Sequence, residues 1–183
     1  MNHKKIIKSL YNSTANFYDR RYREIQTGKY QSIFKNISIN ATQSILDLGC
    51  GTGNLFLFLN KNECIKYGID FSINSLKKLQ KNTNRARIIH IICADIEYLP
   101  FKVEQFDFVF AITILQNLPD IEKSVQEMKS ICKIDGFLIL SLLRKKISLE
   151  SIEKVLIDAQ ITPLKIIDEE ACEDIILICQ NKV

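Results

Sequence analysis

Apolar residues recur along this chain with two different periods, and the period changes near residue 44. Before that point the apolar positions lie three or four residues apart, the spacing of one helix face: Tyr30, Ile33, Phe34 and Ile37. A shorter run with the same spacing predicts an earlier helix, with Gly28 as its stop: Tyr18, Tyr22 and Ile25.

From Ser44 onward, short apolar runs alternate with amphipathic segments. The runs predict strands at residues 44–48, 65–70, 87–93, 106–112 and 137–143. Helices are expected from about Asn54, from Ser72, after Pro119 and around Ile152. Strands that alternate with helices are typical of a parallel sheet with helices on both faces.

The last two apolar runs, 164–167 and 175–179, are separated only by a short acidic connection. That connection is too short for a crossover helix, so the two strands are expected to form an antiparallel hairpin. The predicted fold class is therefore α/β, with a doubly wound, mostly parallel, seven-stranded sheet, an antiparallel last strand and N-terminal helices. We divide the chain into an N-terminal helical segment, 1–43, and a core, 44–183.

Composition narrows the class of protein. Hydrophobic residues make up 46% of the chain and charged residues 25%, as in ordinary soluble globular proteins. The net charge of +4 is too mild to indicate a dedicated nucleic-acid binder. Residues 1–43 nevertheless carry eight basic and two acidic groups. This excess is either a solvated helical face or an attraction for an anionic partner.

The cysteines and histidines do not predict a metal site. The six cysteines form no Cys-x-x-Cys pair and the chain has only two histidines, which excludes the spacings of zinc fingers. Cysteines inside apolar runs are expected to be buried free thiols, which suits a reducing compartment. Because no apolar run approaches about 18 residues and the N-terminus lacks a signal-peptide stretch, we expect a cytoplasmic protein.

A glycine-rich loop follows the first predicted strand and precedes a helix, with the sequence Gly49-Cys50-Gly51-Thr52-Gly53. In doubly wound folds this position binds nucleotides or nucleosides. The dinucleotide fingerprint would need a further glycine where this chain has Asn54. Because like charges repel, the carboxylate of Asp47 beside the loop disfavours a phosphate and favours a cationic ligand.

Two more acids follow the next two strands. Asp70 ends the second strand, about 20 residues past the loop, where a carboxylate can accept both hydroxyls of a ribose. The alternative role for Asp70 is to cap the helix that begins near Ser72. Asp95 follows the third strand, in Ala94-Asp95-Ile96.

Together these motifs resemble the class I S-adenosylmethionine-dependent methyltransferases. Four elements occur in the family's order and spacing: Asp-Leu-Gly-Cys-Gly-Thr-Gly (47–53), Gly-Ile-Asp (68–70), Ala-Asp-x-x-x-Leu-Pro-Phe (94–101) and Phe-Asp-Phe-Val (106–109). Leu118-Pro119-Asp120 and Gly136-Phe137-Leu138 resemble the subgroup with ubiquinone and menaquinone biosynthesis methyltransferases. The resemblance implies a Rossmann-like methyltransferase fold, S-adenosylmethionine as cofactor and methyl transfer as the activity.

The resemblance also implies a role for each matched position. The glycine loop would lie under the methionine portion, with Asp47 near its ammonium and Asp70 holding the ribose. Asp95 would accept from the adenine amino group. The N-terminal tyrosines would close as a lid, with plain helix packing as the alternative: Tyr11, Tyr18 and Tyr22. The expected cofactor-binding residues are Asp47, Gly49, Cys50, Gly51, Gly53, Asp70, Phe71, Asp95, Ile96, Ala111 and Tyr18.

On the acceptor side, Gln116 and Asn117 replace the paired histidines that many relatives carry before Leu-Pro-Asp. These are the candidate catalytic residues, and they would orient the acceptor rather than deprotonate it, because alignment and desolvation can supply much of the rate. The methyl acceptor stays open. The basic segment and the small size favour RNA or protein slightly, and a small quinone-type molecule is the alternative.

The third strand is expected at the sheet edge, where Ile88-Ile89-His90-Ile91-Ile92 is very apolar. Exposed edges invite pairing with another chain. Some small relatives of the fold pair there with a zinc-binding activator subunit, whereas coverage by the protein's own helices is the alternative.

Two other functions compete with methyl transfer. A non-catalytic scaffold of the same fold is disfavoured because Asp47, Asp70, Asp95 and the loop glycines are all present. A nicotinamide oxidoreductase is disfavoured by Asn54 and by the antiparallel last strand.

Overall fold

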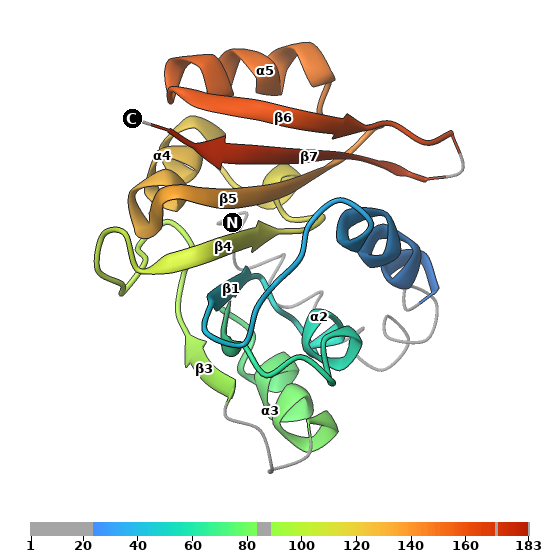
Figure 1. Cartoon of the computed structure of the whole chain (residues 1–183), viewed down its shortest axis with the longest axis vertical. Helices are drawn as coiled ribbons and strands as arrows, with labels where there is room; N and C mark the ends of the chain where they lie inside the picture. The colour runs from blue at the N-terminus through green and yellow to red at the C-terminus, as the bar shows by residue number, and fades with distance from the viewer. Residues whose placement is uncertain (1–23, 84–88, 171, 183) are drawn as a thin grey trace, which may run out of the picture.

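A computed structural model describes residues 24–83, 89–170 and 172–182, and its centre is a seven-stranded sheet (Figure 1). The strand order is β3-β2-β1-β4-β5-β7-β6. The strands are β1 (Ser44–Leu48), β2 (Ile65–Asp70), β3 (Ile89–Cys93), β4 (Phe106–Ala111), β5 (Cys132–Leu143), β6 (Ile161–Ile167) and β7 (Asp174–Asn181). Strands β1 to β5 are parallel, and β7 runs antiparallel to both of its neighbours. The predicted fold class is confirmed.

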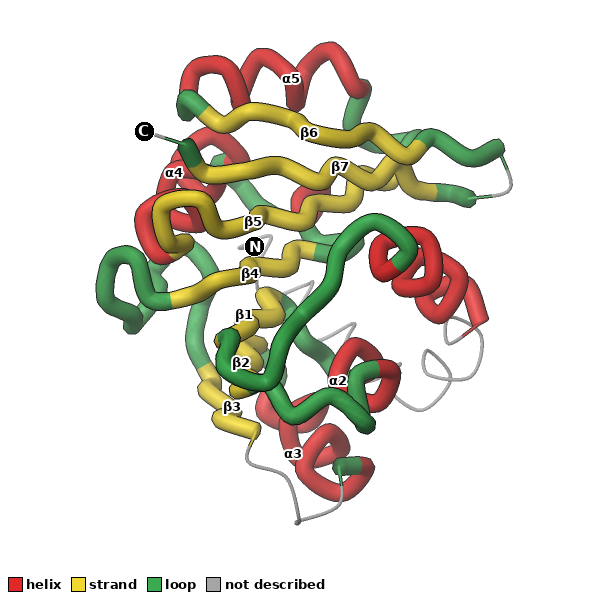
Figure 2. The backbone as a smooth tube through the Cα atoms, in the orientation of Figure 1, coloured by secondary structure: helices red, strands yellow, loops and turns green. Residues whose placement is uncertain are grey.

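Helices cover both faces of the sheet (Figure 2). A helix at residues 24–34 packs on one face together with α2 (Asn54–Phe58) and α3 (Ile73–Asn82), and the opposite face carries α4 (Ile121–Ile131) and α5 (Leu149–Asp158). A short 3₁₀ helix, η1 (Leu115–Asn117), follows β4. Because both faces are covered, β4 is buried at every position except Asp107.

The longer helices begin at polar caps that the sequence supplies. The hydroxyls of Ser72 and Ser148 accept from the backbone N–H three residues ahead, and so does the carboxylate of Asp120. Each cap satisfies one of the N–H groups that a helix start leaves unpaired. The expected helix starts after Ser72 and Pro119 are confirmed.

The predicted stop at Gly28 is wrong, because the helix at residues 24–34 runs through it. Gly28 is exposed, whereas Lys29, Tyr30 and Ile33 are buried against the sheet. A glycine inside a helix costs roughly 1 kcal/mol, and burial of this helix face outweighs that cost. Tyr11, Tyr18 and Tyr22 belong to residues 1–23, outside the described ranges, so the lid stays a prediction.

Four of the six cysteines are buried free thiols, as expected: Cys50, Cys64, Cys132 and Cys179. The other two free thiols are the exposed Cys93 and the half-buried Cys172. Among the described residues, none of the helices is both long enough and apolar enough to cross a membrane. In the same ranges, no three His, Cys, Asp or Glu side chains are grouped as metal ligands would be.

Two glycine substitutions test this packing. A Cβ at Gly68 would lie 2.9 Å from both Cys50 Sγ and Phe56 Cε2, whereas a Cβ at Gly28 would have no atom of the described residues within 4 Å. We expect Gly68→Ala to destabilise the protein by about 1–3 kcal/mol through overpacking. We expect Gly28→Ala to stabilise it by about 0.5–1 kcal/mol. Urea denaturation of both variants measures the difference, and equal effects would contradict the packing described.

Candidate functional site

The predicted cofactor residues lie at the carboxyl ends of neighbouring strands. Asp47, near the end of β1, pairs with Gly68 of β2 and with Phe110 of β4. Asp70 ends β2 and pairs with Cys93, two residues before Asp95. The strand order reverses at β1, and such a reversal creates the crevice where doubly wound sheets bind ligands.

The glycine loop after β1 has a left-handed backbone, with φ of 69° at Gly49, 52° at Gly51 and 88° at Gly53. A Cβ at Gly49 would lie 2.1 Å from Ile114 Cδ1, and the positive φ would strain any other residue, so both observations favour glycine here. At Gly51 the nearest atom to such a Cβ is the Gly49 carbonyl oxygen, 3.9 Å away. Among the described residues, the space beside Gly51 is therefore open to a ligand that approaches the backbone.

Asp70 fixes the shape of this loop. Its Oδ2 accepts from the N–H of Gly51 at 2.9 Å, and its Oδ1 accepts from the N–H of Ser72 at 2.7 Å. Burial raises the pKa of the Asp70 carboxyl, and these two hydrogen bonds oppose the rise. Each carboxylate oxygen can accept a second hydrogen bond, so the side chain that holds the loop can also bind hydroxyl groups.

Asp47 is a buried carboxylate that has neither a hydrogen-bond donor nor a cation beside it in the described part of the chain. Asp47 as a whole is only 5% exposed to solvent. Burial raises its pKa well above the usual range, and repulsion from Asp70 raises it further. Burial likewise raises the pKa of Tyr30, with the charge of Asp47 as the next cause. An uncompensated buried carboxylate is costly, so this position favours a ligand that brings a positive charge.

The remaining predicted cofactor residues surround this pair of acids. Asp95 is half-buried, and its Oδ1 accepts from the N–H of Glu97 at 3.1 Å. Ile96 is buried in the core, Phe71 is half-buried and Ala111 ends β4. The Cys50 side chain lies instead against Gly68, beneath the loop. The Cys50 side chain is therefore buried in the core, and Tyr18 lies outside the described residues.

Gln116 and Asn117 lie together on η1, directly after the loop that follows β4. Gln116 Nε2 donates to the carbonyl oxygen of Thr113 at 2.7 Å. A carbonyl can only accept, so this bond fixes which end of the amide is the NH₂ group. Gln116 Oε1 is then a buried acceptor with no donor among the residues described.

Sequence reasoning missed Lys29 and Asp174. It placed Lys29 in a solvated or anion-binding segment and Asp174 in an acidic connection, yet their side chains form a buried ion pair at 2.9 Å. Thr113 Oγ1 accepts from Lys29 Nζ and donates to Asp174 Oδ2, both at 2.8 Å. No local pattern predicts a pair so distant in sequence. The one available signal was a lysine on the same helix face as Ile33.

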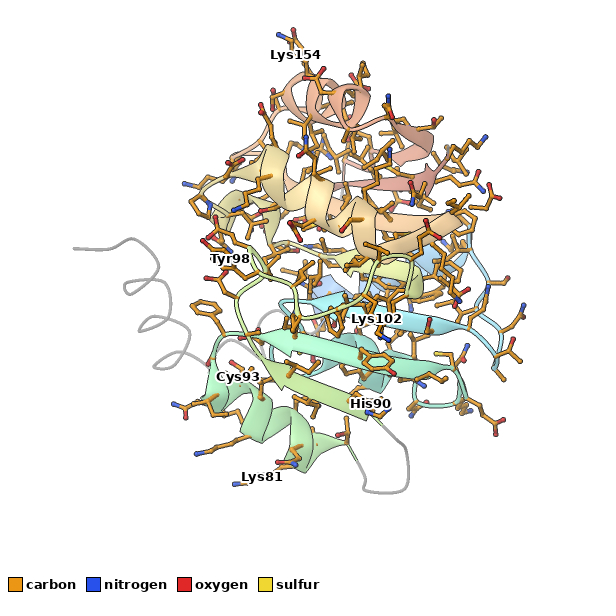
Figure 3. All side chains as sticks on the ribbon, turned by 90° about the vertical axis from the view of Figure 1, so that its left-hand side faces the viewer. Lys81, His90, Cys93, Tyr98, Lys102 and Lys154 are labelled. Carbon is orange, nitrogen blue, oxygen red and sulfur yellow. The ribbon has the colours of Figure 1, made fainter. Side chains whose placement is uncertain are left out.

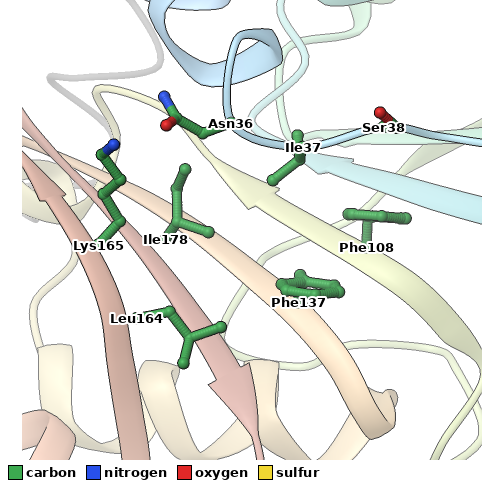
Figure 4. A pocket seen from close by; sticks show the side chains of 8 residues that line it. All are labelled: Asn36, Ile37, Ser38, Phe108, Phe137, Leu164, Lys165 and Ile178. Carbon is green, nitrogen blue, oxygen red and sulfur yellow. The ribbon is translucent and has the colours of Figure 1, made fainter.

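A separate apolar hollow of about 360 Å³ lies on the sheet face that carries the helix at 24–34 (Figure 4). Phe108, Phe137, Leu164 and Ile178 form its apolar lining, and Asn36 and Lys165 are among its polar residues. It contains none of the acids described above, so it is distinct from the cofactor site.

Comparison with known proteins places the chain in a family. Residues 46–140 match the family model described as a methyltransferase domain, and the chain belongs to that family. It is 31% identical over 143 residues to a demethylmenaquinone methyltransferase of Desulfitobacterium hafniense, which covers 73% of this chain and 56% of the relative. It is 30% identical over 138 residues to a 2-phytyl-1,4-naphtoquinone methyltransferase of Nostoc punctiforme, and this match covers 69% of this chain and 60% of the relative. The chain thus spans little more than half the length of these curated relatives.

Solved structures share the fold. A magnesium protoporphyrin IX methyltransferase from Synechocystis, solved with bound S-adenosylmethionine, superposes with a TM-score of 0.83 at 20% identity and covers 100% of this chain and 98% of its own. A chain from the complex between the Haloferax volcanii Trm112 methyltransferase activator and a methyltransferase gives a TM-score of 0.75 at 14% identity. The match covers 94% of this chain and 98% of that chain. These likenesses confirm the Rossmann-like methyltransferase fold.

The raised pKa of Asp47 predicts a pH-dependent stability in the absence of ligand. Between the ordinary carboxyl pKa, about 3.9, and the raised value, the folded state binds more protons than the unfolded state. Stability therefore falls as pH rises through that interval. Asp47→Asn removes the titrating group, so it should be more stable than the wild type at pH 7.

Urea denaturation from pH 4 to pH 8 measures this effect. The advantage of Asp47→Asn should shrink as pH falls toward 4. Asp120→Asn is a matched control, because asparagine caps α4 as well as aspartate does. A wild type as stable as Asp47→Asn throughout this pH range would contradict the account of Asp47.

Proposed function

We propose that this chain binds S-adenosylmethionine at the carboxyl edge of the sheet and transfers its methyl group to a small organic acceptor. The observation that carries the proposal is the buried Asp47 carboxylate, which has no counter-charge in the described ranges and lies beside the open loop at Gly51. A cofactor with an ammonium group and a sulfonium centre fits that environment, whereas a phosphate does not. When bound, the cofactor supplies a methyl group that is already activated for transfer.

The residues around the crevice fit the other parts of this cofactor. Asp70 keeps one acceptor position on each oxygen for the ribose hydroxyls, after its bonds to Gly51 and Ser72. Asp95, beside β3, would accept from the adenine amino group, with Ile96 as an apolar neighbour. The motif matches assign these roles, and the shared strand ends support them.

On the acceptor side, Gln116 would orient the methyl acceptor. Its amide orientation leaves Oε1 as a hydrogen-bond acceptor, which suits a hydroxyl or amine on the substrate. Asn117 lies beside it on the same 3₁₀ turn. Neither side chain is a general base near neutral pH, so these residues would act by alignment.

The comparisons give no support to the slight preference for RNA or protein. The relatives reported above are named for quinone-type acceptors, which favours the small-molecule alternative. Most of the basic groups that suggested a polyanion belong to residues 1–23, outside the described ranges. Of the other two, Lys29 is buried in an ion pair and Lys35 is exposed. We therefore favour a small aromatic acceptor that carries a hydroxyl or amine.

We also propose that an activator subunit pairs with β3. This strand lies at the end of the sheet, as predicted, and its Ile89, Ile91 and Ile92 are only half-buried. His90 and Cys93 are exposed on the same strand (Figure 3). An apolar edge strand is a template for another chain, and the Haloferax complex shows that a protein of this fold can take an activator.

The activity is tested with S-adenosylmethionine labelled on its methyl group. The protein is incubated with extract of its source cells, and the RNA, protein and organic-soluble fractions are then separated. We expect label in the organic-soluble fraction. Asp70→Asn should lower S-adenosylhomocysteine affinity roughly 10–100-fold, because hydrogen bonds to a charged group are lost, and should reduce labelling. Asp120→Asn, which changes an exposed helix cap, should leave both unchanged.

The outcomes separate the hypotheses. Label in the RNA fraction that decreases steeply with added salt would show that the acceptor is RNA. That result would overturn the choice of a small-molecule acceptor but would keep the conclusion that the protein is a methyltransferase. Binding of S-adenosylhomocysteine without any labelled product would favour the non-catalytic scaffold. Absence of binding would refute the proposed function.

The activator proposal predicts that purification from the native source yields a complex. Size-exclusion chromatography with mass spectrometry should find a small second protein at a fixed ratio. A monodisperse monomer with no second protein would contradict the pairing at β3.

A further inference from the structure

Thr113, in the loop between β4 and η1, has a left-handed backbone with φ of 56°. A β-branched residue rarely adopts that conformation, because its Cβ substituents crowd the backbone. Such strain persists only where the surrounding structure imposes it, and it is concentrated at functional sites. The strain at Thr113 therefore indicates that its contacts impose this conformation and that the conformation positions neighbouring residues.

Contacts from three distant elements hold Thr113. Lys29, from the helix at residues 24–34, donates to its hydroxyl, which in turn donates to Asp174 at the start of β7. Ser141, from β5, accepts from the N–H of Thr113 and donates to Asp174 Oδ2, both at 2.7 Å. Lys29 and Asp174 lie at the centre of this network, because their ion pair bonds to the hydroxyls of both Thr113 and Ser141.

The conformation of Thr113 places residues on both sides of the proposed reaction. Its carbonyl oxygen accepts from Gln116 Nε2, which orients the amide of the proposed acceptor residue. The next residue, Ile114, lies against Gly49 of the cofactor loop. A change in the backbone at Thr113 would therefore move the acceptor side and the cofactor side relative to each other.

Stability alone explains this network poorly. A buried ion pair is often no more stabilising than a well-packed apolar pair of the same volume. Three buried oxygens around Thr113 also have no donor among the described residues: Gln26 Oε1, Gln116 Oε1 and Asp174 Oδ1. Buried acceptors left without donors cost stability, so the arrangement is better explained by the geometry that it imposes.

We infer that Lys29 and Asp174 are positioning residues for methyl transfer: their buried ion pair holds Thr113 left-handed, and Thr113 thereby sets Gln116 and Ile114. This inference rests on the proposed function, because the geometry that it describes lies between the cofactor and acceptor sides. Neither residue needs to touch the cofactor or the acceptor.

The test replaces both charges together, since either single replacement would leave an unpaired buried charge. Lys29→Met with Asp174→Asn should lower the rate of label transfer at saturating S-adenosylmethionine about 10–100-fold. S-adenosylhomocysteine affinity should stay within about threefold, because the cofactor acids are untouched. The control is Lys133→Met with Asp107→Asn, a more exposed ion pair of the same length at the amino ends of β4 and β5. The control should keep the wild-type rate.

Thr113→Gly distinguishes a positioning role from a direct one. Glycine adopts a positive φ without strain, so it should not need the ion pair. We therefore compare the triple variant, which adds Thr113→Gly to the double variant, with the single variant Thr113→Gly. The triple variant should transfer label at no less than about a third of the rate of the single variant. The amide signals of Gly49 and Ile114 should shift in the double variant and return toward the wild type in the triple variant.

Each contrary result has a separate meaning. A double variant with the wild-type rate would overturn the inference, and so would a loss that Thr113→Gly does not rescue. If the wild type itself fails to bind S-adenosylhomocysteine, the proposed function is refuted and the positioning role falls with it.

Discussion

The burial of two carboxylates near the ends of adjacent parallel strands is the constraint on which the proposed cofactor site depends. Asp47 and Asp70 lie on β1 and β2 at the point where the strand order reverses, and burial raises the pKa of both. Asp70 offsets part of its cost by binding the N–H groups of Gly51 and Ser72. Asp47 has no such compensation in the described part of the chain. The free protein therefore carries a cost that a cationic ligand would relieve.

The helix at residues 24–34 reaches both halves of the proposed site. Tyr30 lies near enough to Asp47 for that charge to raise its pKa, after burial itself. The preceding residue, Lys29, reaches Thr113 and Asp174 on the acceptor side. Lys29 therefore contacts the proposed acceptor side, and its neighbour Tyr30 is buried in the same apolar cluster as Cys50 of the glycine loop. The N-terminal segment, which the sequence separates from the core at residue 43, contributes side chains to the core's own site.

Local patterns predicted the fold well, for physical reasons. The strands at 44–48 and 65–70 have the predicted boundaries, because each mainly apolar segment stops at a glycine or an aspartate. The predicted cofactor residues follow strands whose carboxyl ends lie at one edge of the sheet, and their roles stay predictions. Gly28 does not end the helix, because the low helix propensity of one glycine costs less free energy than the burial of Tyr30 and Ile33 provides. The pair of Lys29 and Asp174 depends on tertiary packing, which no local pattern records.

The central claim is that Asp47 recognises the ammonium of the cofactor's methionine portion. The most direct measurement compares S-adenosylhomocysteine with 5′-methylthioadenosine, which lacks that portion, by isothermal titration calorimetry on the wild type and Asp47→Asn. The account predicts that the wild type binds S-adenosylhomocysteine at least about tenfold more tightly and that Asp47→Asn loses most of this preference. Equal affinities of the wild type for the two compounds, or an unchanged preference in Asp47→Asn, would contradict it.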